Sequence, residues 1–179
     1  DIKLFNAVID TWAKSRRREA GTKAEMWLKR LEKEAGRIGD EELRPTTVVY
    51  TSVMDAWAKS GDPEAPEHVE AILDRMLKRY EAGDKRVRPD LTSFNTAINT
   101  WAMSHRKNAG ARAEDALERL DEFAKRRGDV ELRPDTISYN AVLDAWAKSG
   151  DPAAPERAEA IVIHMVKLFD EGNVRVKPD

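Results

Sequence analysis

Short polar side chains recur at four regularly spaced places, at Asn6, Thr51, Asn95 and Asn140. After three of them an aspartate follows four residues later and a lysine eight residues later, an offset that keeps the side chains on one helix face. Ion pairing along a helix explains the Asp and Lys. It does not explain the Asn and Thr, which are mediocre helix formers on a face where Glu, Lys or Gln would do better. An amide donates and accepts hydrogen bonds whereas a carboxylate only accepts, so this face could distinguish the polar edges of a ligand.

Residues for catalysis or metal binding show no recognisable arrangement. The chain has no cysteine, and His68, His105 and His164 show no ligand-like spacing. The sequence contains no Gly-rich phosphate loop and no GxSxG or HExxH motif. We therefore predict no catalytic residue, no metal site, no cofactor and no enzyme activity.

Composition limits the classes of partner. The net charge is -2, from 31 Lys and Arg against 33 Asp and Glu, which argues against indiscriminate binding to polyanions but allows a basic stripe on one face. Charged residues make up 36% of the chain and hydrophobic residues 41%, too much charge for a membrane protein and too much apolar content for disorder. No uncharged run reaches the roughly 18 residues that a membrane span requires, so no membrane partner is predicted.

The polar face repeats because the whole sequence repeats. Four tryptophans are spaced 45, 44 and 45 residues apart, at Trp12, Trp57, Trp101 and Trp146, and four prolines follow a similar period. The predicted repeats are 1–45, 46–89, 90–134 and 135–178. Residues 1–89 also align without a gap with 90–178 and are identical at 48 positions. We expect a single repeat array over 1–179 that arose by duplication of an 89-residue block.

Each repeat is predicted to form two helices. In the second repeat, apolar residues recur at helical spacing from about 48–60 and again over 69–80, with Gly61 ending the first helix. Thr22 and Glu25 match a capping box that would start the second helix of the first repeat. One helical hairpin cannot bury both of its apolar faces, but stacked hairpins can. The pattern therefore predicts an all-α solenoid of eight helices with the tryptophans in its core.

The residues around the polar positions resemble a known repeat family. An aromatic residue precedes each one, as in Phe5-Asn6 and Tyr139-Asn140, and a basic residue with proline closes each repeat. The segment RPDTISYNAVLDAWAKSG (133–150) is similar to the pattern of the pentatricopeptide repeat family, whose helical hairpins bind RNA. The resemblance covers all four repeats, although 44 and 45 residues exceed the family's usual repeat length. It implies a right-handed α-solenoid of four stacked hairpins.

The resemblance also implies how the polar face is used. Single-stranded RNA would lie along the first helices, with one base read by each repeat. The edge-reading pairs would be Asn6 with Thr46, Thr51 with Asp90, Asn95 with Asp135, and Asn140 with Asp179. The residues that sandwich the bases would be Lys3, Val48, Thr92 and Ile137. The phosphate contacts would come from Lys14, Lys59 and Lys148.

In this family, Asn with Asp resembles a uracil reader and Thr with Asp a guanine reader. The resemblance therefore implies the preference pyrimidine or any base, then G, U and U, read 5′ to 3′. It also implies a mitochondrial or plastid factor in RNA processing, stability or translation. The chain starts at Asp1 and ends at a repeat boundary, so we expect flanking repeats in a longer protein.

Two other interpretations remain open. The first is a peptide- or protein-binding scaffold resembling tetratricopeptide repeats, which would carry varied and often longer side chains on the same face. The second is a purely structural array whose reading positions have degenerated, an interpretation consistent with the net charge of -2.

Overall fold

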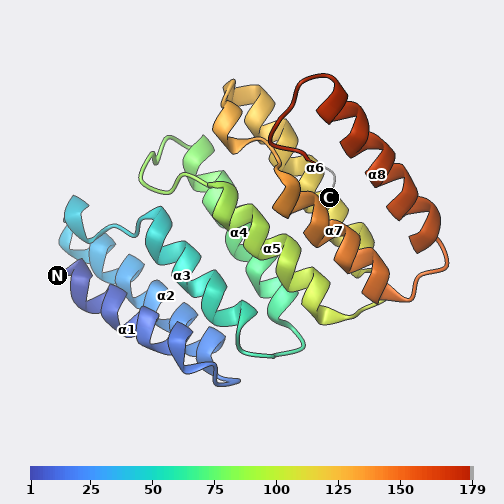
Figure 1. Ribbon diagram of the computed structural model, residues 1–179. Coiled ribbons are helices and arrows are strands. Elements are labelled where there is room, and N and C mark those ends of the chain that lie inside the picture. Colours follow the sequence, from blue (N-terminus) through green and yellow to red (C-terminus); the bar gives the residue numbers. More distant parts are fainter. Residues whose placement is uncertain (178–179) are drawn as a thin grey trace. The chain divides into compact units, whose positions relative to one another are not determined.

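All regular structure in residues 1–177, the part of the chain that the computed structural model describes, is helical (Figure 1). The α-helices are α1 (Ile2–Ser15), α2 (Ala20–Ile38), α3 (Thr47–Ala58), α4 (Ala65–Glu81), α5 (Leu91–Ser104), α6 (Ala109–Arg127), α7 (Thr136–Ser149) and α8 (Ala154–Asp170). Short 3₁₀ helices, η1 (Glu41–Leu43) and η2 (Val130–Leu132), follow α2 and α6. Within these residues the prediction of an all-α, helical-repeat fold with eight helices is confirmed. The right-handed path of the stack stays a prediction.

The chain divides into two compact units, and each is described by itself. The N-terminal unit is Asp1–Thr96, and the C-terminal unit begins at Ala97. In the N-terminal unit, α1, α2 and α3 pack against one another and α3 also packs on α4 (Figure 1). Each helix contributes apolar side chains to the buried interior, among them Ile9, Leu28, Met54 and Met76. An apolar stripe on each helix faces this interior, and its polar stripe faces outward.

The C-terminal unit has its own core. Ile98 and Trp101 from α5 pack in one cluster with Trp146 of α7 and Met165 of α8. Val176, in the turn after α8, is fully buried in the same cluster. The helical spacing of the apolar residues thus accounts for the core, and the closing turn adds to it.

A close approach between glycine and tryptophan occurs once in each unit. A Cβ atom on Gly21 of α2 would lie 2.1 Å from Cδ2 of Trp57 on α3. A Cβ atom on Gly110 of α6 would lie 2.2 Å from the same atom of Trp146 on α7. Only glycine leaves room for the indole ring at these places, which explains the Ala-Gly pairs at 20–21 and 109–110.

Two local predictions about helix ends were wrong. The helix α2 begins at Ala20 rather than at Thr22, so Thr22 and Glu25 lie inside the helix and form no capping box. The Glu25 carboxylate instead accepts a hydrogen bond from Trp57 Nε1 at 3.1 Å. The helix α3 ends at Ala58, before Gly61, and the Ser60 N–H bonds the carbonyl of Trp57 at 3.1 Å in a tighter, 3₁₀-type turn.

The tryptophans are not all core residues. Trp57, Trp101 and Trp146 are buried, whereas the remaining two, Trp12 on α1 and Trp27 on α2, are partly exposed. None of the helices in residues 1–177 combines the length and the apolar character needed to cross a bilayer.

Candidate nucleic-acid interface

The four polar positions lie on the first helix of each predicted pair and differ in exposure. Asn6 on α1, Thr51 on α3 and Asn95 on α5 are half-buried, and Asn140 on α7 is exposed. The amide oxygen of Asn6 is itself buried, and no group in residues 1–177 donates a hydrogen bond to it. Buried acceptors are usually satisfied, so this oxygen is an exception to the usual pattern.

The Thr51 hydroxyl has a fixed role as a donor. It lies 3.1 Å from the carbonyl oxygen of Thr47 and 3.0 Å from that of Val48, one turn earlier in α3. A hydroxyl has one proton and two lone pairs, so donation to its own helix leaves it as an acceptor toward any ligand. Thr51 therefore presents acceptor character on the outer face of α3.

The predicted acidic partners are held at helix starts. Asp90 Oδ1 accepts from the backbone N–H of Ser93 at 2.8 Å and from its hydroxyl at 2.6 Å. Asp135 Oδ1 accepts from the corresponding groups of Ser138, both at 2.9 Å, and forms a capping box at α7. Each cap uses Oδ1 alone, so Oδ2 takes no part in it. Thr46 stands at the same place before α3, but its side chain makes no capping bond.

Thr47, at the start of α3, acts as a clamp: its hydroxyl and its backbone N–H bond two carbonyl groups of the turn that precedes Asp90. Thr47 Oγ1 donates to the carbonyl oxygen of Arg88 at 2.7 Å, and the Thr47 N–H bonds the carbonyl of Arg86 at 2.9 Å. Arg88 is two residues before Asp90, and Thr47 is one helical turn before Thr51. These bonds therefore bring the Asp90 carboxylate to the same end of the helix pair as the Thr51 hydroxyl.

The same clamp recurs in the C-terminal unit. Thr136 Oγ1 lies 3.1 Å from the carbonyl of Arg175 and 3.2 Å from that of Lys177, and the Lys177 N–H donates to Thr136 Oγ1 at 2.9 Å. The clamp thus holds the turn after α8 against the start of α7.

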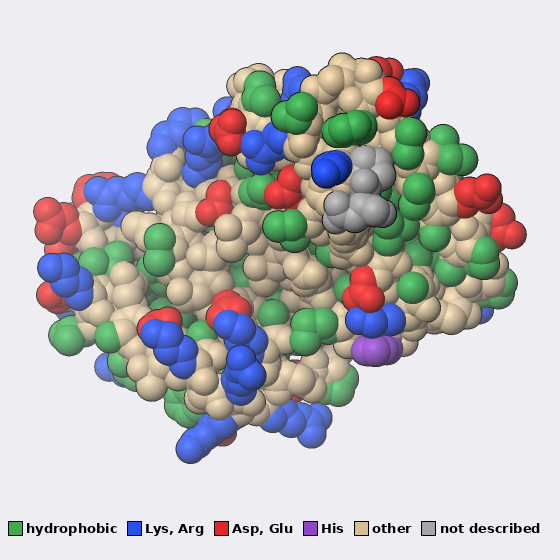
Figure 2. All heavy atoms as spheres, viewed as in Figure 1, with side chains coloured by type: hydrophobic (Ala, Val, Ile, Leu, Met, Phe, Trp, Pro, Cys, Tyr) green, Lys and Arg blue, Asp and Glu red, His purple; other side chains and the backbone are tan. Residues whose placement is uncertain are grey.

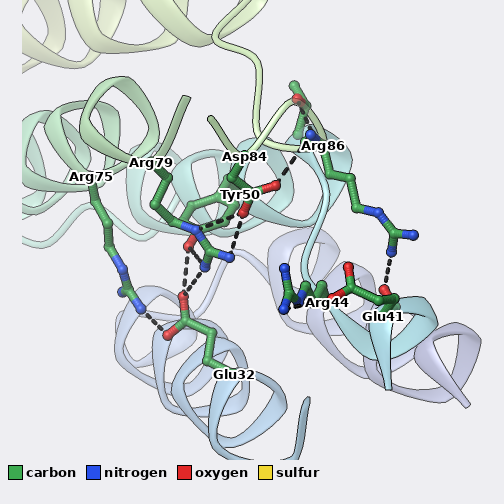
Figure 3. Close-up of polar contacts among 9 residues, drawn as sticks. Glu32, Glu41, Arg44, Tyr50, Arg75, Arg79, Asp84 and Arg86 are labelled. Carbon is green, nitrogen blue, oxygen red and sulfur yellow. Dashed lines mark hydrogen bonds and ion pairs between the residues drawn. The ribbon is translucent and has the colours of Figure 1, made fainter. Parts of the chain in front are cut away.

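An arginine braces each closing turn, and sequence reasoning missed it. The guanidinium of Arg86 bonds the backbone carbonyl of Glu41 in η1 (Figure 3). Arg175 bonds the carbonyl of Glu131 in η2 at 3.0 Å and its carboxylate at 2.8 Å. Recurrence of these arginines, and of the clamping threonines, at a spacing of 89 residues was the signal that could have found them.

A comparison with family models found a match in the second repeat. The family model described as PPR repeat matches residues 48–80, which contain most of α3 and α4 and carry Thr51. This match supports assignment of the second repeat to the pentatricopeptide repeat family. A search of the curated proteins found no match. Pentatricopeptide repeat proteins are in general helical-repeat proteins that bind RNA, are not enzymes and act in organelles.

The residues predicted to sandwich bases are exposed in the first turns of their helices. Val48 on α3 and Ile137 on α7 each expose 64% of their surface, large fractions for aliphatic side chains. Lys3 on α1 and Thr92 on α5 are also exposed. Burial of such aliphatic surface against a flat ligand would be favourable.

The three lysines predicted to contact phosphates are already paired. Lys14 lies 2.5 Å from Asp10, and Lys59 and Lys148 each lie 2.6 Å from the aspartate four residues earlier. Figure 2 shows basic side chains beside acidic ones where α1 and α3 lie on the face drawn, rather than in a purely basic patch. Exposed pairs of this kind are weak, so a phosphate could compete for the lysine. Met103 replaces lysine on α5 and is exposed.

Two of the predicted pairs stay predictions. Asn95 belongs to the N-terminal unit and Asp135 to the C-terminal unit, so each is described only within its own unit. Asp179, the predicted partner of Asn140, lies outside the described residues. No group of three or more potential metal ligands occurs within residues 1–177.

Proposed function

We propose that this protein binds single-stranded RNA sequence-specifically, with one base read by each of the four repeats 1–45, 46–89, 90–134 and 135–178. The observation that carries the proposal is the Thr47 clamp, which holds Asp90 at the same end of the helix pair as Thr51. A ligand edge could then meet one group from the helix and one from the turn. The protein acts by binding, without catalysis, and needs neither a metal nor a cofactor.

The second repeat is the guanine reader of this proposal. Thr51 uses its proton within α3 and so offers an acceptor, and the Asp90 carboxylate also only accepts. The pairing edge of guanine carries two adjacent donors, its ring N–H and its exocyclic amino group. Two acceptors opposite two donors favour guanine over uracil, which has a single donor on that edge.

The third and fourth repeats are the uracil readers. Asn95 and Asn140 each offer an amide, which donates as well as accepts. An amide N–H would meet a uracil carbonyl, while the carboxylate of Asp135 or Asp179 accepts from the uracil ring N–H. The first repeat pairs Asn6 with Thr46, whose hydroxyl is not held in a cap, so its base is the least restricted. The proposed preference is pyrimidine or any base, then G, U and U.

Affinity would come from stacking more than from charge. Lys3, Val48, Thr92 and Ile137 are exposed and would pack against base faces. Each stacked base contributes about 1–3 kcal/mol in single-strand binding, before ordering costs. The lysines at 14, 59 and 148 would exchange their aspartate partners for phosphates. Given the family's general role, we propose that the protein acts in a mitochondrion or plastid, in RNA processing, stability or translation. We also propose that it forms part of a longer chain with flanking repeats.

The test is selection from a pool of randomised short RNA, with a randomised peptide pool as a parallel arm. We expect enrichment of G followed by two U. A matched variant, Asp90→Asn, adds a donor to the second reading pair and should lower enrichment of G there while leaving the two U positions unchanged. Retention of peptides without RNA would support the tetratricopeptide-like alternative instead. Retention of neither would leave a purely structural array.

A further inference from the structure

Tyrosine stands at equivalent places in the two units, at Tyr50 on α3 and Tyr139 on α7, 89 residues apart. In the N-terminal unit the tyrosine is fully engaged (Figure 3). Its hydroxyl donates to Glu32 Oε1 of α2 at 2.6 Å and accepts from Arg79 Nη1 of α4 at 2.9 Å. Arg79 also bonds Asp84 at 2.7 Å.

Two guanidinium groups occupy the space beside Tyr50. The central carbons of Arg75 and Arg79 lie 5.7 and 5.8 Å from the centre of the Tyr50 ring, within the range of a cation–π contact. Both side chains are bonded to the Glu32 carboxylate (Figure 3). The N-terminal unit therefore shows what this arrangement of tyrosine and carboxylate accepts, namely planar cations that donate hydrogen bonds.

The C-terminal unit keeps the tyrosine and the carboxylate but lacks both arginines. Asp121 stands where Glu32 does, while His164 replaces Arg75 and Leu168 replaces Arg79. A pocket of about 190 Å³ lies between α6, α7 and α8, lined by Tyr139, Asp121 and His164 among others. The shorter side chains leave open a space that arginine fills in the other unit.

The Tyr139 hydroxyl is available for hydrogen bonding in the pocket. Tyr139 is 94% buried, since only 6% of its surface is exposed, and it lines the pocket. No hydrogen bond to its hydroxyl occurs within residues 1–177, whereas the Tyr50 hydroxyl makes two. Burial, and then the charge of Asp121, raises the pKa of Tyr139 to about 12, so the hydroxyl stays protonated. The hydroxyl is not one of the fully buried unpaired atoms, so it is open to the pocket and can accept a hydrogen bond from an incoming donor.

The charges around the pocket favour a cation. Glu118 lines it where the N-terminal unit has Lys29, so a positive charge has been exchanged for a negative one. Asp121 adds a second carboxylate, which pairs at the surface with Lys125. The Glu114 carboxylate is already paired with Arg157. The pocket thus joins an aromatic ring, an unpaired hydroxyl and acidic groups.

We propose that this pocket of the C-terminal unit binds a guanidinium group supplied from outside the chain. The incoming group would lie over the Tyr139 ring, bond the Asp121 carboxylate and donate to the tyrosine hydroxyl, as Arg79 does at Tyr50. The volume is below the 300–1,000 Å³ that is common for drug-sized ligands, and suits a guanidinium with a short stem. The site does not depend on RNA binding.

The direct test is an NMR titration of the whole chain with methylguanidinium, with methylurea as the neutral planar control. We expect saturable shifts of the Tyr139 and His164 ring signals at millimolar methylguanidinium, little shift at Tyr50, and no saturation with methylurea. Equal responses to both probes, or equal shifts at Tyr50 and Tyr139, would overturn the proposal.

Variants separate the proposed contacts from general effects. Asp121→Asn should weaken methylguanidinium binding by about tenfold, the loss expected for one hydrogen bond to a charged group. Glu122→Gln, an equal change of charge at an exposed neighbour, should leave binding unchanged. His164→Arg should fill the pocket from within and abolish binding while the helical circular dichroism is retained. The assignment would be contradicted if either Asp121→Asn or a folded His164→Arg protein bound methylguanidinium as tightly as the wild type does.

Two further probes distinguish the source of the group. Agmatine carries a guanidinium on a free aliphatic stem, and a blocked Gly-Arg-Gly peptide carries it on a protein side chain. Binding of agmatine alone would identify a small-molecule site, and binding of both would identify a site for an arginine side chain. Binding of neither, in a folded protein, would overturn the proposal.

Discussion

Gly21 lies so close to Trp57 that a Cβ atom at this position would come within 2.1 Å of the indole ring. Gly21→Ala should therefore move the indole or separate α2 from α3, at a cost of about 1–3 kcal/mol in the free energy of unfolding. Gly36 in the same helix has no atom within 4 Å of the corresponding point, so Gly36→Ala should be neutral or stabilising by about 0.5–1 kcal/mol. Urea unfolding of both variants checks this. Equal effects would show that the ring is not confined by Gly21.

Thr47→Val should loosen the turn before Asp90 while keeping the shape of the side chain. The lost bonds to the carbonyls of Arg86 and Arg88 should cost about 1 kcal/mol or more in unfolding free energy. RNA affinity should fall most for ligands with G at the second position. Thr22→Val, an exposed change in α2, is the control and should alter neither quantity. Loss of stability with unchanged preference for G would separate the clamp from base reading.

Much of the fold could be predicted from the sequence because its signals are periodic. The spacing of Trp57 and Trp146 and the helical apolar stripes predict the helices, and the structure has them. The capping box at Thr22 failed because a short motif occurs readily inside a charged helix such as α2. The role of Gly21 was not foreseen, since a glycine inside a helix signals a contact only when its neighbour across the core is known.

The candidate site was predictable as a set of positions but not as a geometry. Family resemblance places Thr51 and Asp90 at reading positions, and the family match covers Thr51. The clamp by Thr47 was missed because its partners are backbone carbonyls about 40 residues away, which leave no trace in side-chain types. The pocket at Tyr139 was missed for a different reason, because the exchange of Arg75 and Arg79 for His164 and Leu168 is one of many differences between the two blocks.

Glu25 should make stability depend on pH. Its carboxylate lies 2.9 Å from Lys29 Nζ and 3.3 Å from His68 Nδ1. Burial by itself would raise the pKa of this carboxyl. The hydrogen bonds and charges of Lys29, His68 and Trp57 outweigh burial and lower the pKa below its ordinary value of 4.5. The resulting stabilisation is complete above pH 4.5 and is lost as the pH falls through the lower, folded-state pKa.

Glu25→Gln should therefore flatten the decline of the melting temperature between about pH 5 and pH 3. Glu42→Gln, at an exposed carboxyl of η1, serves as the control and should retain the decline. Parallel curves for the wild type and Glu25→Gln would show that this carboxyl does not contribute.

Asp55→Asn should release Lys59 from its ion pair and make it available to phosphate. We expect tighter binding of all RNA sequences alike, and a slope of log K against log salt that is steeper by up to about 0.7, the value for one contact to a single strand. Lys59→Ala should weaken all sequences and make the slope shallower. A change in base preference from either variant would mean that these side chains read bases.

The most direct test of the account is the base preference of Thr51→Asn. The change replaces an acceptor with an amide beside Asp90 and so converts the proposed guanine reader into the proposed uracil reader. Fluorescence anisotropy with two RNA ligands that differ only in G or U at the second position gives the ratio of their dissociation constants. We predict that the ratio shifts toward U by about tenfold, the scale of one good edge contact, while circular dichroism is unchanged. An unchanged ratio in a folded Thr51→Asn protein would contradict base reading at this surface.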